Sequence, residues 1–516
     1  ELEIWKEIAD GGWNDISESE IATNQMLAYL DTYANHTDDR LETMEKYYTA
    51  GYIKDTDFCF DMLTEYKNAD ELTAEQKNRR TEILTNLAAN GIYVGGLPDV
   101  AENAAVMAEV IETAFSYQNS FEYAEMLAKM RVGVTNGTNI ADSVGTGITY
   151  QLVSQAVEKA LESPEDFVWS YIAVMFYNNQ EQHSLYLTAD YSDDKRILAV
   201  VENFEKQFEK QLGKDITKEE RLGIKKLVMQ TYLRALALDK CADYGLEALK
   251  EFDNFFIREN TMYALLKTGR YDECLKLAKE VQDDTNPVPL YYAAASTLES
   301  GEFDASAEYV LELAKQVKTS EYPKKADELL HSYFSLLVVD TETTKAKYSL
   351  LSDEQINKLN SDEFLKNYLE AYVNACYPSY GGHSIYDDAY TQAMETALAA
   401  ADRVISERGE LCYPYYLKGV THMQQKKYDE AVAAYKKAID YKSDDPMIWY
   451  ALYAAYEELE EWENAYTAAE IAIGLSPWFN YYSDYEGIGI HPYSYREGAK
   501  AMIEKQHEAS QKGGNE

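Results

Sequence analysis

Histidine and cysteine are the side chains of this sequence best suited to bind a metal ion or to act as nucleophile or general base. The 7 histidines form no HExxH motif and no pair of the spacing that zinc modules use. The cysteines lie far apart with no CxxC pair, which argues against a zinc site and a disulfide framework. They are Cys59, Cys241, Cys274, Cys376 and Cys412. We therefore predict no catalytic residue, no metal and no cofactor, and expect these thiols to fill helix faces as small apolar groups.

Carboxylates and glycines give no better sign of chemistry. The acidic cluster Glu457-Glu458-Glu460-Glu461 lacks the alternating oxygen ligands and the glycine of an EF-hand loop, so we interpret it as a solvated helix face. The glycines between 131 and 149 match neither a phosphate-binding loop nor a dinucleotide fingerprint. The nucleophile motif G-x-S-x-G is also absent. We therefore do not expect this chain to be an enzyme.

Charge narrows the class of partner. The chain has 48 Lys+Arg against 90 Asp+Glu, a net charge of −42 that repels the phosphates of nucleic acids. Basic proteins, cationic peptides and neutral glycans remain compatible with this charge. Hydrophobic residues make up 46% of the chain, and 10 Pro with 25 Gly suit long helices better than many short strands. We expect a folded, helical protein that does not bind nucleic acid.

Location is predicted from two features. No apolar run reaches the roughly 18 residues that a membrane span requires, so we expect no membrane insertion of this segment. The chain begins at Glu1 and not at Met, from which we expect that a signal peptide, a membrane anchor or a tag stood upstream. We therefore predict an extracytoplasmic bacterial protein, secreted or anchored at the surface, with a cytoplasmic protein as the alternative.

Two segments near the C-terminus repeat one pattern with a period of 34 residues. The landmark pairs are Tyr415 and Trp449, Ala431 and Ala465, and Ala438 and Ala472. The small residues allow two helices to approach closely, and the aromatic residues fill the space between neighbouring helix pairs. Together with Pro477 at the exit, residues 412–477 resemble the tetratricopeptide repeat. The resemblance implies an all-α fold, a superhelix of stacked helix pairs.

Weaker copies of this pattern stand upstream. Gly269-Arg270-Tyr271 and Gly301-Glu302-Phe303 resemble the turn between the two helices of a pair, and Tyr271 and Phe303 are 32 residues apart. Residues from about 250 to 317 therefore resemble the same family. Thr73-Ala74-Glu75-Gln76 predicts a helix capping box within an additional N-terminal helical domain. The predicted segments are 1–130 (N-terminal helical domain), 131–162 (glycine-containing linker and connecting helix), 163–376 (degenerate repeat array), 377–477 (C-terminal array), 478–510 (aromatic loop and capping helix) and 511–516 (disordered tail).

The family resemblance also implies a ligand groove on the concave side, lined by fixed positions of the first helix of each pair. With repeats beginning at Pro287, Cys412 and Pro446, the fifth position is Tyr291, Tyr416 and Tyr450. The remaining groove residues implied in this way are Tyr413, Val420, Met423, Met447, Ala454, Glu457 and Glu458, with Val288 and Glu299 near Tyr291. Tyrosine offers a flat contact area and a hydroxyl at little entropic cost, which suits peptide or sugar recognition.

The sequence thus predicts a non-enzymatic scaffold or adaptor that binds a protein or peptide along an aromatic groove with an acidic edge. A surface protein that binds glycans through exposed tyrosines is the first alternative. A cytoplasmic regulator whose repeats sense a signalling peptide is the second. The fifth and ninth positions hold Tyr with Val or Ala in the C-terminal repeats, in place of the Lys and Asn of the family's carboxylate clamp, so we do not expect a receptor of that type.

Overall fold

The computed structural model divides into two compact units, Glu1–Gln180 with Ser192–Gly213, and Glu181–Tyr191 with Lys214–Glu516. The described residues are 16–33, 37–50, 56–90, 150–179, 192–212, 217–281, 286–320, 323–338, 347–376, 388–475 and 498–505, with a few single residues between 106 and 113. Within these ranges every regular element is a helix, which confirms the predicted all-α class. The predicted boundary at 131–149, the aromatic loop after Pro477 and the tail 511–516 lie outside the described residues.

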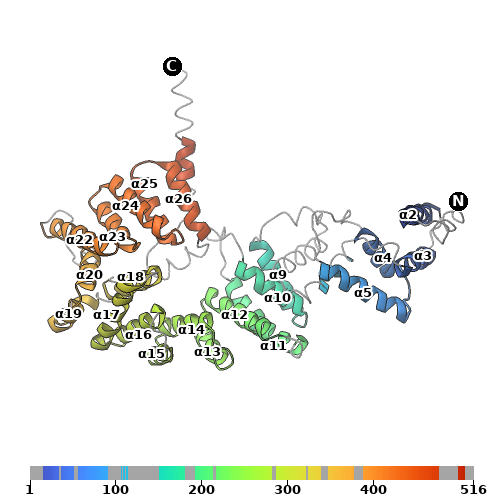
Figure 1. The fold of residues 1–516 in the computed structure, drawn as a ribbon, viewed down its shortest axis with the longest axis horizontal. Coiled ribbons are helices and arrows are strands. Elements are labelled where there is room, and N and C mark those ends of the chain that lie inside the picture. The colour runs from blue at the N-terminus through green and yellow to red at the C-terminus, as the bar shows by residue number, and fades with distance from the viewer. Residues whose placement is uncertain are drawn as a thin grey trace, which may run out of the picture. The chain divides into compact units, whose positions relative to one another are not determined.

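The first unit contains two groups of helices (Figure 1). In the first group each helix packs on the next: α2 (Ile16–Tyr33), α3 (Thr37–Ala50), α4 (Thr56–Asn68) and α5 (Ala74–Asn90). The second group is a mutually packed trio: α9 (Tyr150–Glu162), α10 (Phe167–Asn179) and α11 (Ser192–Leu212). The predicted capping box is confirmed, because the Gln76 backbone N–H donates to Thr73 Oγ1 at 3.2 Å and the Thr73 N–H donates to Gln76 Oε1 at 2.9 Å. In the trio, the rings of Phe167 and Phe204 stack at 5.5 Å.

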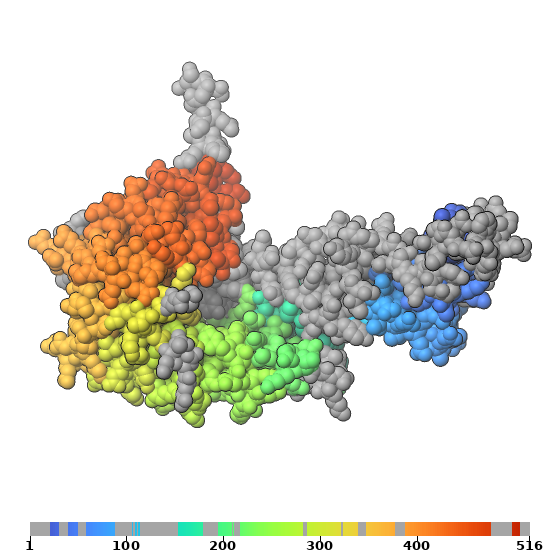
Figure 2. Space-filling view, viewed as in Figure 1, coloured from blue at the N-terminus to red at the C-terminus, as the bar shows by residue number. Residues whose placement is uncertain are grey.

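The second unit is a row of helix pairs, each packed on the next (Figures 1 and 2). We call the first members the inner helices: α12 (Lys218–Arg234), α14 (Phe255–Lys267), α16 (Pro287–Glu299), α18 (Lys324–Val338), α20 (Glu363–Ala375), α23 (Tyr413–Gln424) and α25 (Pro446–Glu458). The second members, the outer helices, are α13 (Leu238–Ala248), α15 (Tyr271–Lys279), α17 (Phe303–Thr319), α22 (Asp388–Glu407), α24 (Tyr428–Tyr441) and α26 (Trp462–Leu475). A 3-10 turn (Lys347–Leu350) and α19 (Asp353–Leu359) follow α18.

The row curves because its two sides pack differently. Each inner helix contacts the inner helix of the next pair, from α12 to α14 and onward to α23 and α25. The outer helices pack chiefly on their own partner and on the next inner helix. Successive inner helices are therefore drawn together, and they line the concave side of the curve that Figure 1 shows from α12 to α20. This is the arrangement of an α-solenoid.

One backbone turn recurs in five of these pairs. Its marker is a residue of positive φ between the inner and the outer helix: Leu236, Gly269, Gly301, Lys426 and Glu460, with φ of 50°, 75°, 84°, 58° and 57°. In each turn the next N–H donates to the carbonyl five residues earlier, as Glu302 does to Thr297 at 2.7 Å. This bond closes a Schellman-type helix end, which requires the left-handed conformation. The pair α12–α13 has the same turn although its sequence shows neither Gly nor an aromatic residue there.

A small buried side chain follows each of these turns at the same distance. The residue five positions after the positive-φ residue is Cys241, Cys274, Ser306, Ala431 or Ala465, and none is more than 1% exposed. Three of them bond to the facing inner helix: Cys241 Sγ donates to the Met229 carbonyl at 4.0 Å, Cys274 Sγ to the Met262 carbonyl at 3.4 Å and Ser306 Oγ to the Ala294 carbonyl at 2.8 Å. Burial raises the pKa of Cys241 to about 12 and of Cys274 to about 11. These thiols stay protonated and serve as packing residues, as predicted.

The turn makes a testable contribution to stability. Gly301→Ala places a Cβ at φ 84° with no other atom within 4 Å, so only backbone strain changes. We expect the free energy of unfolding to fall by about 1 kcal/mol. Lys426→Gly relieves the same backbone strain in the pair α23–α24. It should therefore raise the free energy of unfolding by up to about 1 kcal/mol. Urea denaturation followed by circular dichroism measures the free energy of unfolding of both variants. If both substitutions changed it in the same direction, the two turns would not share the left-handed conformation that we describe.

Candidate binding face

Five of the predicted groove residues lie together on the inner helices of the last two pairs. Tyr416, Val420 and Met423 of α23 and Tyr450 and Ala454 of α25 are partly exposed. All five pack against one buried cluster, which is formed by Leu452, Tyr453, Tyr435, Ala431 and their neighbours. We call these five residues the aromatic patch. Residue Ala499, in the helical stretch 498–505, is also buried in this cluster.

The edge of the aromatic patch is acidic. Tyr450 stacks on Tyr453 with ring centroids 6.0 Å apart, and the Tyr453 hydroxyl donates to Glu457 Oε1 at 2.9 Å. Glu457 and Glu458 are exposed at the C-terminal end of α25. Met447 stands at the other end of α25, where its N–H donates to the side chain of the N-cap residue Asp445 at 2.9 Å. Met447 thus lies near one end of α25, and the two carboxylates lie at the other.

Tyr413 is only 5% exposed, so its main contacts are internal. Its hydroxyl donates to Asp445 Oδ2 at 2.6 Å, and burial raises the pKa of this phenol well above its ordinary value. Tyr291 lies on α16, against Tyr292 with ring centroids 5.0 Å apart, and the structure does not bring it into the aromatic patch. Beside it Val288 is buried, and the carboxylate of Glu299 pairs with Lys347 at 3.0 Å.

His331 is a residue that the sequence analysis missed. Its imidazole, on α18, stacks on the ring of Tyr413 at 4.2 Å and lies 5.0 Å from Tyr372 and 5.6 Å from Tyr416. Burial lowers the pKa of His331 to about 3, so the ring is neutral at physiological pH. The stack joins α18 to α23 across the intervening α20. No local pattern could reveal it, since its partners come from two other helices, α20 and α23.

Asp327 is the second missed residue, one turn before His331 on α18. Its carboxylate is 1% exposed and accepts three hydrogen bonds. The donors are the Tyr368 hydroxyl at 2.6 Å, the Cys412 N–H at 2.9 Å and the Tyr413 N–H at 3.2 Å. The residue Cys412 is the N-cap of α23 and makes no side-chain cap bond of its own. Asp327 therefore caps α23 from a helix 85 residues away.

Ion pairs also bridge the inner side. Lys325 of α18 pairs with Glu259 of α14 at 3.4 Å, across α16. Glu328 of α18 pairs with Lys442, just before α25, at 3.2 Å. Together with the stack of His331 on Tyr413, these contacts fill the middle of the concave side with the protein's own side chains.

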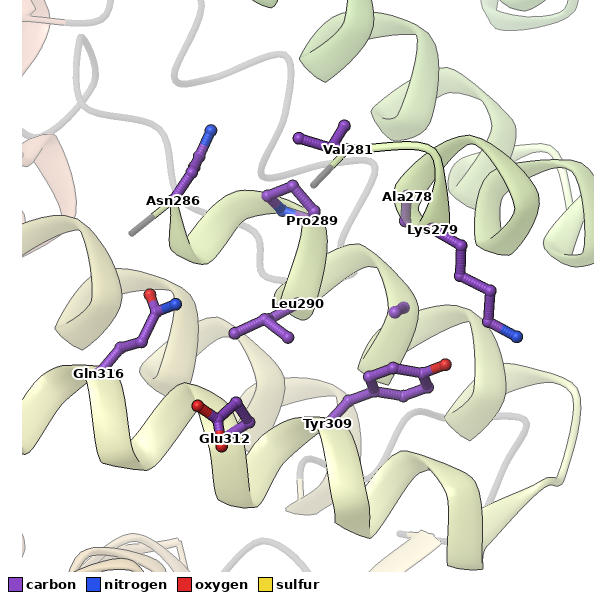
Figure 3. A pocket seen from close by; sticks show the side chains of 10 residues that line it. Ala278, Lys279, Val281, Asn286, Pro289, Leu290, Tyr309, Glu312 and Gln316 are labelled. Carbon is purple, nitrogen blue, oxygen red and sulfur yellow. The ribbon is translucent and has the colours of Figure 1, made fainter. Parts of the chain in front are cut away.

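A pocket of about 200 Å³ opens between α15, α16 and α17 (Figure 3). It exists because α15 has only 9 residues, so the last turns of α17, which has 17, extend beyond it. Pro289, Leu290 and Ala293 supply apolar lining, while Lys279 and Glu312 stand on different sides. None of the predicted groove residues lines this pocket, so it is a feature apart from the aromatic patch.

Within the described ranges, no three side chains of the His, Cys, Asp and Glu type are grouped closely enough to hold a metal ion. No helix described here is both long and apolar enough to cross a membrane. The candidate face instead carries aromatic rings, aliphatic side chains and a few charged groups on two neighbouring helices.

One family model agrees with the helix pairs near the C-terminus. A family model described as "TPR repeat" matches residues 419–459, which span the second half of α23, α24 and α25. No curated protein matches the sequence. One similar solved structure is the "TPR2AB-domain:pHSP90-complex of yeast Sti1", at 13% identity over 55% of this chain and 99% of that chain, with a TM-score of 0.21. Another is the "APC/C hetero-tetramer Cut9-Hcn1", at 11% identity over 96% of each chain, with a TM-score of 0.26. Residues 419–459 thus match the model of a tetratricopeptide repeat, a unit of two helices that stacks on its neighbours.

Proposed function

We propose that this chain is a non-enzymatic scaffold that binds a peptide segment of a partner protein on the aromatic patch. The observation that carries the proposal is the clustering of five partly exposed aromatic and aliphatic side chains on two adjacent inner helices. They are already held in place by the buried cluster beneath them. A ligand that lies on them would displace water from apolar surface without having to order the protein first.

The composition of the aromatic patch favours a peptide over a small metabolite. Tyr450 is a partly exposed tyrosine on the edge of the patch, and Met423 can adapt to the shape of a partner side chain. Glu457 and Glu458 at the edge favour a ligand with a basic residue at that end. A surface of this kind suits an extended or helical peptide that makes several shallow contacts with it.

The test uses peptides selected by phage display on the full chain. We expect Tyr450→Ala to weaken the selected peptides by about 5- to 30-fold, the loss typical of an interfacial tyrosine. Ala454→Gln adds bulk in the middle of the aromatic patch and should weaken them by about tenfold. Isothermal titration calorimetry measures both affinities.

Ala433→Gln is the matched control, because Ala433 is exposed on the outer helix α24. The same substitution there should leave the affinity unchanged. Equal affinity for the Ala454→Gln variant and the wild type would exclude the aromatic patch as the site. A glycan array that shows binding lost with Tyr450→Ala, together with no selected peptide, would replace the proposal by the glycan-binding alternative.

A further inference from the structure

The pocket between α15, α16 and α17 stands where the C-terminal pairs have more helix. The pairs α16–α17 and α25–α26 align residue by residue, because Pro287 and Phe303 are as far apart as Pro446 and Trp462, which begin the same helices. The outer helix that precedes the first pair is α15, with 9 residues, and the one that precedes the second is α24, with 14 residues. In the C-terminal pairs the outer helix therefore continues for more than one turn beyond the point where α15 ends.

The inner helix α16 also has smaller side chains at the pocket than its counterpart α25. Ala293 occupies the position of Leu452, and Leu290 occupies that of Trp449. Leu452 is 3% exposed and belongs to the buried cluster under the aromatic patch. The pocket thus corresponds to space that a longer outer helix and larger inner side chains fill in the C-terminal pairs.

The volume and the lining of the pocket suit one apolar side chain. Its volume is about 200 Å³, and Pro289, Leu290 and Ala293 contribute apolar atoms to its lining (Figure 3). An apolar cavity of about 150 Å³ in another protein holds a benzene ring, whereas pockets for drug-sized ligands measure about 300–1,000 Å³. The pocket therefore has room for the side chain of a leucine or a phenylalanine, but not for a ligand of several rings.

Two polar groups at one end of the pocket are available to a neighbour of that side chain. They are the ammonium of Lys279, exposed near the C-terminal end of α15, and the hydroxyl of Tyr309 on α17 (Figure 3). Within the described residues neither group has a hydrogen-bond or ion-pair partner. A carboxylate beside the apolar side chain would therefore meet both a positive charge and a hydroxyl donor.

The acids near this end of the pocket do not cancel the charge of Lys279. Glu312, the acid of the lining, pairs with a lysine of its own helix at 3.1 Å and stands on a different side of the pocket. Glu280, next in the chain, lies 3.9 Å from an arginine of α14. The pair Asp283-Asp284 follows in the sequence and lies outside the described residues. Lys279 is therefore the charged lining residue that is left for a ligand.

We propose that this pocket receives one leucine or phenylalanine side chain of a partner polypeptide, next to an aspartate or glutamate that pairs with Lys279. A free molecule of that size would bind weakly, because the burial of one ring recovers less free energy than association loses in translational and rotational freedom. A side chain that belongs to a longer bound segment shares this loss with the rest of the segment. The net charge of −42 opposes a strongly acidic ligand, which favours a single acid beside the apolar side chain.

The probe is the peptide acetyl-Gly-Ser-Glu-Phe-Ser-Gly-amide with 4-fluorophenylalanine as its aromatic residue, and its binding to the full chain is followed by fluorine NMR. We expect saturable binding that weakens by about tenfold or more in Ala293→Leu. That variant gives α16 the side chain that α25 has at the same position, and so fills the pocket. Lys279→Glu should weaken binding by about three- to tenfold, and it should bind the same peptide with Lys in place of Glu more tightly than the wild type does.

Lys276→Glu is the matched control, because Lys276 is exposed on the same helix and does not line the pocket. It changes the net charge equally and should alter the Kd by less than about twofold. Circular dichroism shows whether each variant is folded. Lys279→Glu changes an exposed residue, so it tests the proposal even if Ala293→Leu fails to fold.

Three results would overturn the proposal: no saturable binding by the wild type, unchanged affinity in a folded Ala293→Leu variant, or an equal loss in Lys276→Glu. Tighter binding of 3-(4-fluorophenyl)propionate than of the peptide would assign the pocket to a small organic acid instead. The pocket and the aromatic patch share no residue, so Ala454→Gln should leave the binding of this peptide unchanged. Failure of either proposal therefore leaves the other intact.

Discussion

Asp327→Ala is expected to lower the free energy of unfolding of the repeat unit by about 3 kcal/mol or more. The substitution leaves the Tyr368 hydroxyl and the N–H groups of Cys412 and Tyr413 without their acceptor inside the protein. Each buried donor without a partner costs about 1–3 kcal/mol, and the start of α23 loses its cap. Hydrogen exchange should show faster exchange of the amides of Cys412 and Tyr413 together with a lower urea midpoint.

The control for this prediction is Asp440→Ala. Asp440 is exposed on α24, where its carboxylate pairs with the ammonium of Lys437, also exposed, at 3.1 Å. Removing it should change the free energy of unfolding by no more than about 0.5 kcal/mol. Slow exchange at Cys412 and Tyr413 in Asp327→Ala would show that the cap contributes little.

The same carboxylate predicts a pH dependence. Burial raises the pKa of Asp327 from 3.8 to about 6, although its three donors oppose the rise. The folded state then holds this proton more tightly than the unfolded state between these two values. The contribution of Asp327 to stability therefore falls as the pH rises from about 4 to 6, by about 3 kcal/mol. Asp327→Asn cannot titrate, so its unfolding free energy should fall less over this range than that of the wild type.

Gly419→Ala is expected to be the most damaging change of a single methyl group in the C-terminal repeats. A Cβ on Gly419 of α23 would stand 2.3 Å from Cε1 and 2.5 Å from Cδ1 of Tyr435 on α24. Tyr435 is 2% exposed and packs against Tyr416 with ring centroids 5.9 Å apart, so its ring has little room to move. We expect a loss of about 1–3 kcal/mol, with separation of α23 from α24 and a changed aromatic patch.

Gly223→Ala provides the matched comparison for this clash. Gly223 lies inside α12, and a Cβ there would meet no atom within 4 Å. Alanine should raise the unfolding free energy by up to about 1 kcal/mol, since glycine is a poor helix former. Urea denaturation of both variants distinguishes the cost of the clash at Gly419 from the gain in helix propensity that alanine brings at either site. A neutral effect of Gly419→Ala would mean that the two helices can move apart at no cost.

The C-terminal pairs could be predicted from sequence because their landmarks are chemically distinctive. Pro446 opens α25, and Ala431 and Ala465 mark the helix crossings. The upstream pairs were recognised less fully, since Cys241, Cys274 and Ser306 occupy the position that alanine occupies downstream. Any small side chain fits at this helix crossing. The residue type therefore differs between the upstream and the C-terminal pairs, while the packing geometry is the same. The turn at Leu236 could not be recognised from sequence, because a residue in the left-handed conformation need not be glycine.

The sequence by itself determined the local structure: helices of a given length, their caps, and the short turns that fold two of them into a pair. These follow from interactions between residues a few positions apart, which a single pass along the chain can detect. Only the tertiary structure decided which inner positions face a ligand and which are closed by contacts such as Asp327 with Cys412 and His331 with Tyr413. Those contacts depend on how tightly the row curves, and curvature is the sum of small packing angles over many pairs, which no local pattern specifies.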